Sequence, residues 1–157
     1  MQWVEQRVII HVKKSMNKSL IDSNILIYAH DTDSPFHTAS YNFIKQQVQK
    51  ELVCFTFQNL VEAYRIWTQK LRKPISPKQA VDILNYYLSS DIPVLYPTQQ
   101  TSKILSKLAV SYKIQGVHIF DSLIAALMIE NNIKTIYTIN IRDFSGFREI
   151  SALNPFS

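Results

Sequence analysis

Four carboxylates are the side chains of this sequence best suited to chemistry: Asp22, Glu62, Asp121 and Asp143. Two like charges about 4 Å apart repel by about 4 kcal/mol at an effective dielectric constant near 20, so a cluster of such groups needs a cation. An all-oxygen set without thiolate or imidazole favours Mg²⁺ or Mn²⁺ over zinc. Such ions clamp a phosphodiester and activate a water, so the four acids indicate metal-dependent phosphodiester hydrolysis if they converge.

Each acid, taken alone, also has a structural interpretation. Asp22 and Asp121 are candidate helix N-caps, Glu62 fits a solvated position on a helix, and Asp143 fits an Asx-type turn. These interpretations remain open for each residue singly, and the case for a site depends on bringing the acids together.

The segments that must position these acids alternate between strands and helices. Short runs rich in β-branched and aromatic residues predict strands, and apolar residues at helical spacing predict helices. The expected strands are 19–22, 52–56, 93–96 and 134–139, and the expected helices are 38–50, 57–71, 77–90, 98–112 and 119–131. This order predicts an α/β fold with a short, mainly parallel sheet of four or five strands, sandwiched by helices.

The carboxyl ends of the strands are where ligands bind in open parallel sheets. Asp22 ends the first expected strand, and Asp143 follows the last one. Glu62 lies in the second turn of the helix after the second strand, and Asp121 begins the helix 119–131. We therefore expect all four acids at one edge of the sheet.

Two helices carry the clearest apolar faces. In the helix 57–71, for which Thr56 is a candidate N-cap, the apolar face comprises Phe57, Leu60, Val61, Tyr64, Trp67 and Leu71. Its polar stripe comprises Gln58, Glu62, Arg65, Gln69 and Arg72. The charged end of this helix fits either an ordinary solvated surface or a track that RNA follows beside Glu62. The helix 119–131 is expected to be deeply buried, with an apolar stripe of Phe120, Leu123, Ile124, Leu127 and Met128.

Composition narrows the class of protein. A net charge of +5 favours a polyanionic partner, and two glycines are too few for a phosphate-binding loop of the Walker or dinucleotide type. Cys54 is a lone thiol, expected to be buried and reduced, and no apolar run reaches the ~18 residues of a membrane span. We expect a cytoplasmic protein with one domain, 18–157, and a dispensable N-terminal extension, 1–17.

Four motifs occur in order along the chain: LIDSNILIYA, NLVEAYR, HIFDSLIAA and TINIRDF. Together they resemble the PIN domain, and especially the VapC-type toxins of bacterial toxin–antitoxin pairs, from Lys18 to Phe147. The resemblance implies a ribonuclease that leaves a 5′-phosphate and a 3′-hydroxyl. It implies that Asp22 and Asp121 bind Mg²⁺ or Mn²⁺ most directly and that Glu62 and Asp143 complete the acidic pocket.

The same resemblance implies supporting residues and partners. Asn24 and Asn140 would orient the carboxylates or the substrate, and Arg142, in the variable gap before Asp143, puts a cation beside the pocket. A small antitoxin is expected to cover the acidic crevice with an Arg, and a homodimer is expected through the apolar helix faces. The rival interpretations are a catalytically inactive RNA-binding module of this fold and a metal-dependent phosphatase.

Other residues fit structural roles better than chemical ones. His118, three residues before Asp121, is interpreted as a loop histidine that makes a local hydrogen bond. Trp67, Tyr86 and Tyr87 fit a core or a dimer surface better than a platform for nucleobases, since no basic residues interleave with them. The sequence does not identify the RNA that is cut.

Overall fold

Five parallel strands form the central sheet of the computed structural model, which describes residues 18–157. Across the sheet the strands run in the order β3-β2-β1-β4-β5. Their bounds are β1 Ser19–Ile21, β2 Val53–Thr56, β3 Val94–Leu95, β4 Thr135–Tyr137 and β5 Ser151–Leu153. The α/β fold and the parallel sheet predicted from the sequence are confirmed, whereas the proposed extension 1–17 lies outside the described residues.

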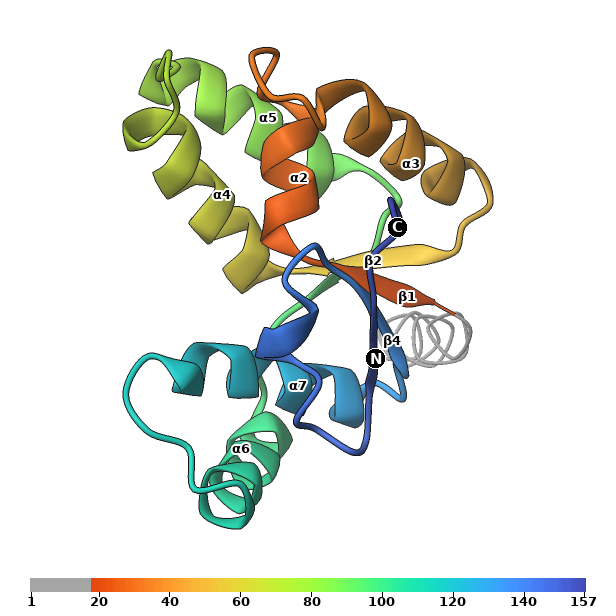
Figure 1. The fold of residues 1–157 in the computed structure, drawn as a ribbon, viewed down its shortest axis with the longest axis vertical. Helices are drawn as coiled ribbons and strands as arrows, with labels where there is room; N and C mark the ends of the chain where they lie inside the picture. Colours follow the sequence, from red (N-terminus) through yellow and green to blue (C-terminus); the bar gives the residue numbers. More distant parts are fainter. Residues whose placement is uncertain (1–17) are drawn as a thin grey trace, which may run out of the picture.

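Helices cover both faces of this sheet, which gives three layers (Figure 1). One face carries α2 (Ser23–Ala29), α3 (His37–Gln49), α4 (Phe57–Gln69) and α5 (Pro77–Ser89). The other carries α6 (Gln99–Ser111) and α7 (His118–Glu130). A single 3₁₀ turn, η1 (Ile141–Asp143), lies between β4 and β5 in the chain. In the part of the chain that is described, no helix combines the length and apolarity needed to cross a membrane.

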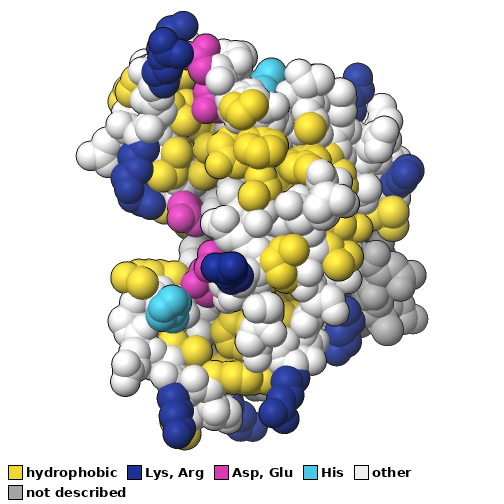
Figure 2. All heavy atoms as spheres, viewed as in Figure 1, with side chains coloured by type: hydrophobic (Ala, Val, Ile, Leu, Met, Phe, Trp, Pro, Cys, Tyr) yellow, Lys and Arg dark blue, Asp and Glu magenta, His cyan; other side chains and the backbone are white. Residues whose placement is uncertain are grey.

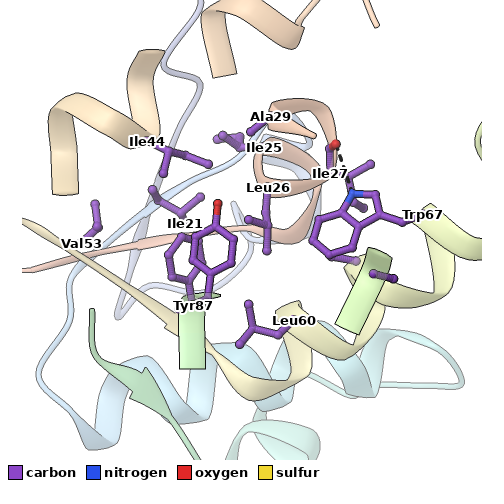
Figure 3. Packing of buried hydrophobic residues seen from close by; sticks show 13 residues of the cluster. Ile21, Ile25, Leu26, Ile27, Ala29, Ile44, Val53, Leu60, Trp67 and Tyr87 are labelled. Carbon is purple, nitrogen blue, oxygen red and sulfur yellow. Dashed lines mark hydrogen bonds between the residues drawn. The ribbon is translucent and has the colours of Figure 1, made fainter. Parts of the chain in front are cut away.

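The alternation of side chains along the strands divides the core into two clusters. In β1, Ile21 packs into the cluster beneath α2 to α5, while Leu20 packs into the cluster with α6 and α7. The first cluster contains Trp67, whose ring Nε1 donates to the Ile27 carbonyl at 3.4 Å (Figure 3). Cys54 belongs to the second cluster and is a buried free thiol, as expected.

Besides η1, two short elements were not predicted. Helix α2 begins directly after Asp22, although its sequence SNILIYA has two isoleucines and a tyrosine, which favour strands. It forms because the Asp22 cap and the burial of four of its apolar side chains outweigh that preference. Strand β5 has only three residues at the sheet edge, so its pattern is too short to be distinguished from a loop. As a result, Asp143 does not follow the last strand: it precedes β5.

Three side chains of the expected apolar helix faces are exposed, and one of them, Phe120, belongs to the helix that was expected to be deeply buried. Phe57 is 38% exposed, Val61 49% and Phe120 59%, because α4 turns Leu60 and Trp67 towards the core instead, and because Phe120 lies in the first turn of α7. Phe57 stacks on Tyr96 at a ring-centroid distance of 5.1 Å. This exposed apolar surface borders the helix that carries Glu62 and the one that carries Asp121.

The aromatic and basic residues singled out in the sequence differ in burial and in position. Trp67 and Tyr87 are buried in the first core cluster, whereas Tyr86 is exposed. Helix α4 ends at Gln69, so Arg72 lies beyond it and is not part of the helical stripe that carries Glu62. The predicted basic track on this helix is therefore shorter than expected.

Reciprocal side-chain caps begin three of the helices. Thr56 and Asn59 form such a capping box at α4, Ser76 and Gln79 at α5, and Thr98 and Thr101 at α6. The cap predicted at Thr56 is confirmed. Because Thr56 ends β2 and caps α4, the chain turns from strand to helix at the edge of the sheet where Asp22 follows β1.

Candidate active site

Asp22 is the central carboxylate of the site, and it is almost completely buried. Its Oδ1 accepts hydrogen bonds from the Ser23 backbone N–H at 2.8 Å and from Asn59 Nδ2 at 3.3 Å. Its Oδ2 accepts from Thr138 Oγ1 at 2.7 Å and from Asn24 Nδ2 at 3.1 Å. These donors come from α2, α4 and the end of β4, so three elements fix the position of one carboxylate.

The N-cap interpretation of Asp22 is therefore correct but incomplete. Asp22 does cap α2, through Ser23 N, yet a cap needs only one such bond and Asp22 receives three more. For Asp121 the N-cap interpretation is wrong, because α7 begins at His118 with Val117 as its cap residue. Asp121 instead lies in the first turn of α7, with its side chain about 30% exposed.

Glu62 reaches the same place from α4. Its Oε2 accepts a hydrogen bond from Ser23 Oγ at 2.8 Å, the residue directly after Asp22. Its Oε1 lies 3.8 Å from Arg65 Nη2, a partly exposed ion pair one turn along the helix. Glu62 is thus held beside Asp22 at the start of α2, not merely solvated on the helix surface.

His118 is closer to the site than the sequence suggested. It is the first residue of α7, not a loop residue, and its Nδ1 lies 3.9 Å from Asp121 Oδ2. Its side chain is 69% exposed. A largely exposed histidine therefore lies beside Asp121 at the edge of the site.

Electrostatics show that the four acids act on one another. Burial raises the pKa of Asp22 from 3.8 to about 6; hydrogen bonds from Thr138 and Ser23 lower it, and the charges of Glu62 and Asp121 raise it. Partial burial is also the largest cause that raises the pKa of Asp121 to about 6. The negative charges of Asp143 and Glu62 raise this pKa as well, whereas His118 lowers it. Four carboxylates that are remote in sequence therefore share one region of negative potential.

The surface of the molecule is indented on the side where acidic side chains gather. Figure 2 shows an indentation of the surface at the left, with Asp and Glu side chains on both sides of it and with a His and a Lys or Arg side chain close by. Asp143 and Arg142 are exposed residues of η1, and Arg65 is exposed on α4. We call the region of negative potential shared by Asp22, Glu62, Asp121 and Asp143 the acidic crevice.

Whether these residues suit a divalent ion depends on the kind of ion. Among residues 18–157, no three His, Cys, Asp or Glu side chains stand close enough together to hold a metal by themselves, which argues against a closed, zinc-type cage. Mg²⁺ and Mn²⁺ differ, since Mg²⁺ keeps several waters and is commonly held by one or two carboxylates together with substrate phosphate. Asp22 and Asp121 repel one another, and among residues 18–157 no lysine or arginine is found to neutralise them, so they fit that second pattern.

Three residues of this network were missed in the sequence: Ser23, Asn59 and Thr138. Each is buried, and each hydrogen-bonds a carboxylate of the crevice. Thr138 also accepts from Asn24 Nδ2 and from the backbone N–H of Asn140, both at 3.0 Å. Asn24 thus contacts Asp22 as anticipated, whereas Asn140 enters the network through its backbone and not through its side chain.

The fold and the site together define an α/β protein with a cluster of carboxylates at the carboxyl edge of its parallel sheet. A family model narrows this class: the PIN domain model matches residues 19–150, so the chain belongs to the PIN domain family. No curated protein matches the sequence at a significant level.

Solved structures with the same fold include three toxin–antitoxin proteins. VapBC2 from Rickettsia felis, bound to a promoter DNA fragment, is 20% identical with a TM-score of 0.64, covering 87% of this chain and 97% of its own. VapC20 of Mycobacterium tuberculosis, a Sarcin-Ricin loop cleaving toxin, is 16% identical with a TM-score of 0.63, covering 85% and 99%. VapBC-1 from nontypeable Haemophilus influenzae is 19% identical with a TM-score of 0.64, covering 88% and 98%.

Proposed function

We propose that this protein is a metal-dependent endoribonuclease that acts as the toxin of a toxin–antitoxin pair. The observation that carries the proposal is the convergence of Asp22, Glu62, Asp121 and Asp143 in one crevice, where they perturb one another electrostatically. Membership of the PIN domain family and the fold shared with VapC proteins support the same activity.

We assign different roles to the four acids of the crevice. Asp22 and Asp121 would hold Mg²⁺ or Mn²⁺, which supplies a water of lowered pKa and neutralises charge on the phosphodiester. Asp22 is kept in one orientation by its four donors. Glu62, fixed by Ser23, and Asp143, on the exposed side, add the negative charge that attracts the cation.

RNA would approach from the open side of the crevice, where two arginine side chains are exposed. Arg142 is exposed in η1, next to Asp143, and Arg65 is exposed on α4, next to Glu62. We assign both to phosphate contacts, which add affinity in a salt-dependent way without reading sequence. Arg72, beyond the end of α4, is more distant along the chain and is assigned a weaker contribution of the same kind.

An antitoxin would inhibit the enzyme by covering the acidic crevice, with an Arg placed among its carboxylates. A bidentate Arg–carboxylate contact replaces the cation by charge-assisted hydrogen bonds. A second surface suits the same partner: a groove of about 690 Å³ between α2, α3 and α5, lined mainly by apolar side chains with Tyr41 and Tyr86 exposed. Such a groove fits the apolar face of a helix.

Growth tests the toxin role. Expression of the chain should arrest growth of the host, and co-expression of its antitoxin should restore growth. Failure to arrest growth by a protein that cleaves RNA in vitro would reject the toxin role and leave the nuclease role intact.

A homodimer would use the exposed apolar side chains at the start of α4 and α7. Phe57, Val61 and Phe120 are exposed there. Gln58 Nε2 donates to the Phe120 carbonyl at 3.1 Å, so the two helices present this surface together. Light scattering of the wild type and of Val61→Glu should give a dimer and a monomer respectively. A monomeric wild type at 100 µM, roughly a hundred times the Kd of a micromolar interface, would reject the dimer.

Cleavage of labelled RNA tests the central proposal. Transfer RNA and a sarcin–ricin loop hairpin are incubated with wild type, Asp22→Asn, Asp121→Asn or the surface control Asp82→Asn, in Mn²⁺ or in EDTA. We expect cleavage with Mn²⁺ by wild type and Asp82→Asn only, with 5′-phosphate and 3′-hydroxyl ends. Equal cleavage by Asp22→Asn and Asp121→Asn, or undiminished cleavage in EDTA, would contradict the mechanism.

A further inference from the structure

Asn59 is a fully buried polar side chain that joins a helix cap to the central carboxylate of the crevice. Its Oδ1 accepts from Thr56 Oγ1 at 2.6 Å and from the Thr56 backbone N–H at 3.4 Å. Its Nδ2 donates to Asp22 Oδ1 at 3.3 Å. The two ends of one amide therefore face two different elements, the cap of α4 and the cap of α2.

The orientation of this amide is determined by Thr56. Because Thr56 presents two donors, the oxygen of Asn59 must face them and the nitrogen must face Asp22. The hydroxyl of Thr56 at the same time accepts from the Asn59 backbone N–H at 3.0 Å, which completes the capping box. The amide has no freedom to turn over without losing both contacts to Thr56.

A cap alone would not require an amide nitrogen at this position. In the capping box of α5, the same place is taken by Gln79, whose Oε1 accepts from Ser76 on the exposed surface. At α6 it is taken by Thr101, which accepts from the Thr98 backbone N–H at 2.8 Å. Only the box at α4 directs a donor at a carboxylate of the crevice.

We propose that Asn59 is a positioning residue for the Asp22 carboxylate, acting on the bound divalent cation through Asp22. This inference rests on the proposed function, because it assumes that Asp22 holds Mg²⁺ or Mn²⁺. Asn59 makes no contact with the crevice surface itself, so its effect is on where and how firmly Asp22 is held. Hydrogen-bonding partners behind a metal ligand typically contribute 10- to 100-fold to metal affinity or activity.

A matched control is available in Thr101. Like Asn59, it is fully buried, occupies the third position of a capping box, and donates to the carboxylate of another helix, in this case Glu130. Glu130 is the last residue of α7, whereas Asp121 lies in the first turn of the same helix. Thr101→Ala therefore removes a comparable cap and a comparable donor without touching the acidic crevice.

The experiment compares metal-free wild type, Asn59→Ala and Thr101→Ala by titration calorimetry with Mn²⁺, by thermal melting and by single-turnover cleavage of RNA. Both variants should melt at a lower temperature than wild type. Only Asn59→Ala should bind Mn²⁺ about 10- to 100-fold more weakly, with a lower rate of cleavage that rises again at high Mn²⁺ and with an unchanged KM for RNA.

A second variant keeps the test informative if Asn59→Ala does not fold. Thr56→Val retains the shape of the strand residue and the Asn59 side chain but removes the hydroxyl that orients the amide, so it should weaken Mn²⁺ binding in the same direction and by less. Wild-type Mn²⁺ affinity in Asn59→Ala, or in Thr56→Val when only that variant folds, would overturn the inference. Absence of Mn²⁺ binding and cleavage by wild type would instead reject the proposed function.

Discussion

The Asp121→Asn variant distinguishes two roles of Asp121: binding a cation, or a purely structural role in α7. In the absence of metal, the carboxylate of Asp121 is repelled by Asp143 and by Glu62. Among the described residues its only close polar partner is His118, at 3.9 Å. The substitution keeps the size of the side chain and removes one negative charge, so we expect the metal-free variant to be more stable than wild type.

The size of this effect follows from the raised pKa. A change from 3.8 to about 6 corresponds to about 3 kcal/mol at about 1.4 kcal/mol per pKa unit. Because 30% of the side chain is exposed, solvent screening reduces this to about 1–2 kcal/mol. The lost attraction of the charge to the N-terminus of α7 offsets about 0.5 kcal/mol. About 1 kcal/mol remains, or a rise of the melting temperature by about 3 °C.

The dependence on pH has a definite sign. Because the pKa of Asp121 is higher in the folded than in the unfolded state, protonation favours folding. The resulting stabilisation of wild type is complete below pH 3.8 and is lost as the pH rises through about 6. Asp121→Asn should therefore melt together with wild type near pH 4 and above it at pH 7.5.

Mn²⁺ should reverse the order of the two proteins. Wild type gains about 2.7 kcal/mol at a Mn²⁺ concentration of 100 times the Kd, whereas the variant gains little. The assay is a set of melting curves at pH 4 and pH 7.5, each with and without Mn²⁺, with Asp82→Asn as the charge-matched control. In the described part of the chain Asp82 pairs with Lys78 on the surface, away from the acidic crevice, so its loss should change neither the pH dependence nor the response to Mn²⁺. An Asp121→Asn protein that melts below wild type at pH 7.5 and responds equally to Mn²⁺ would refute the reasoning.

Three further changes test other parts of the site. Arg142→Ala should raise the KM for RNA and reduce its salt dependence while kcat stays within about twofold, because phosphate contacts supply affinity; initial rates at two salt concentrations measure this. Ser23→Ala removes the hydrogen bond to Glu62 and should slow single-turnover cleavage by about tenfold, with RNA binding unchanged in a filter assay. A chain that starts at Met16 should cleave RNA normally, and a melting temperature lowered by more than about 5 °C would show that the extension stabilises the domain.

The edge of the sheet and the acids along it could be predicted because strong local patterns determine them. Apolar runs mark the strands, and in a parallel sheet all carboxyl ends lie at one edge, so residues such as Asp22 are placed once the strands are recognised. Glu62 followed from its position in the helix after β2. Alternation of strands with helices implies that the strands are parallel, and parallel strands bring the acids that follow them to one edge of the sheet.

The hydrogen bonds that hold the acids could not be predicted in the same way. Asn59 occupies a position where Glu or Gln usually marks a capping box, and nothing in the sequence shows that its side chain points inward. Thr138 follows β4 as one more polar residue of a turn, and its contact with Asp22 depends on the pairing of β1 with β4. Such contacts are properties of the packed structure, and periodicity contains no information about them.

The two carboxylates with a raised pKa are supported in opposite ways, and this difference suggests separate roles. Asp22 is buried, but four donors compensate for its burial and leave it almost no freedom to move. Asp121 is about 30% exposed, receives no such donors among the described residues, and lies near the negative charges of Asp143 and Glu62. If both carboxylates hold the cation, Asp22 would determine its position, because four hydrogen bonds orient that carboxylate. The binding free energy of the cation would come largely from relief of repulsion at Asp121, because that is where charge is least compensated.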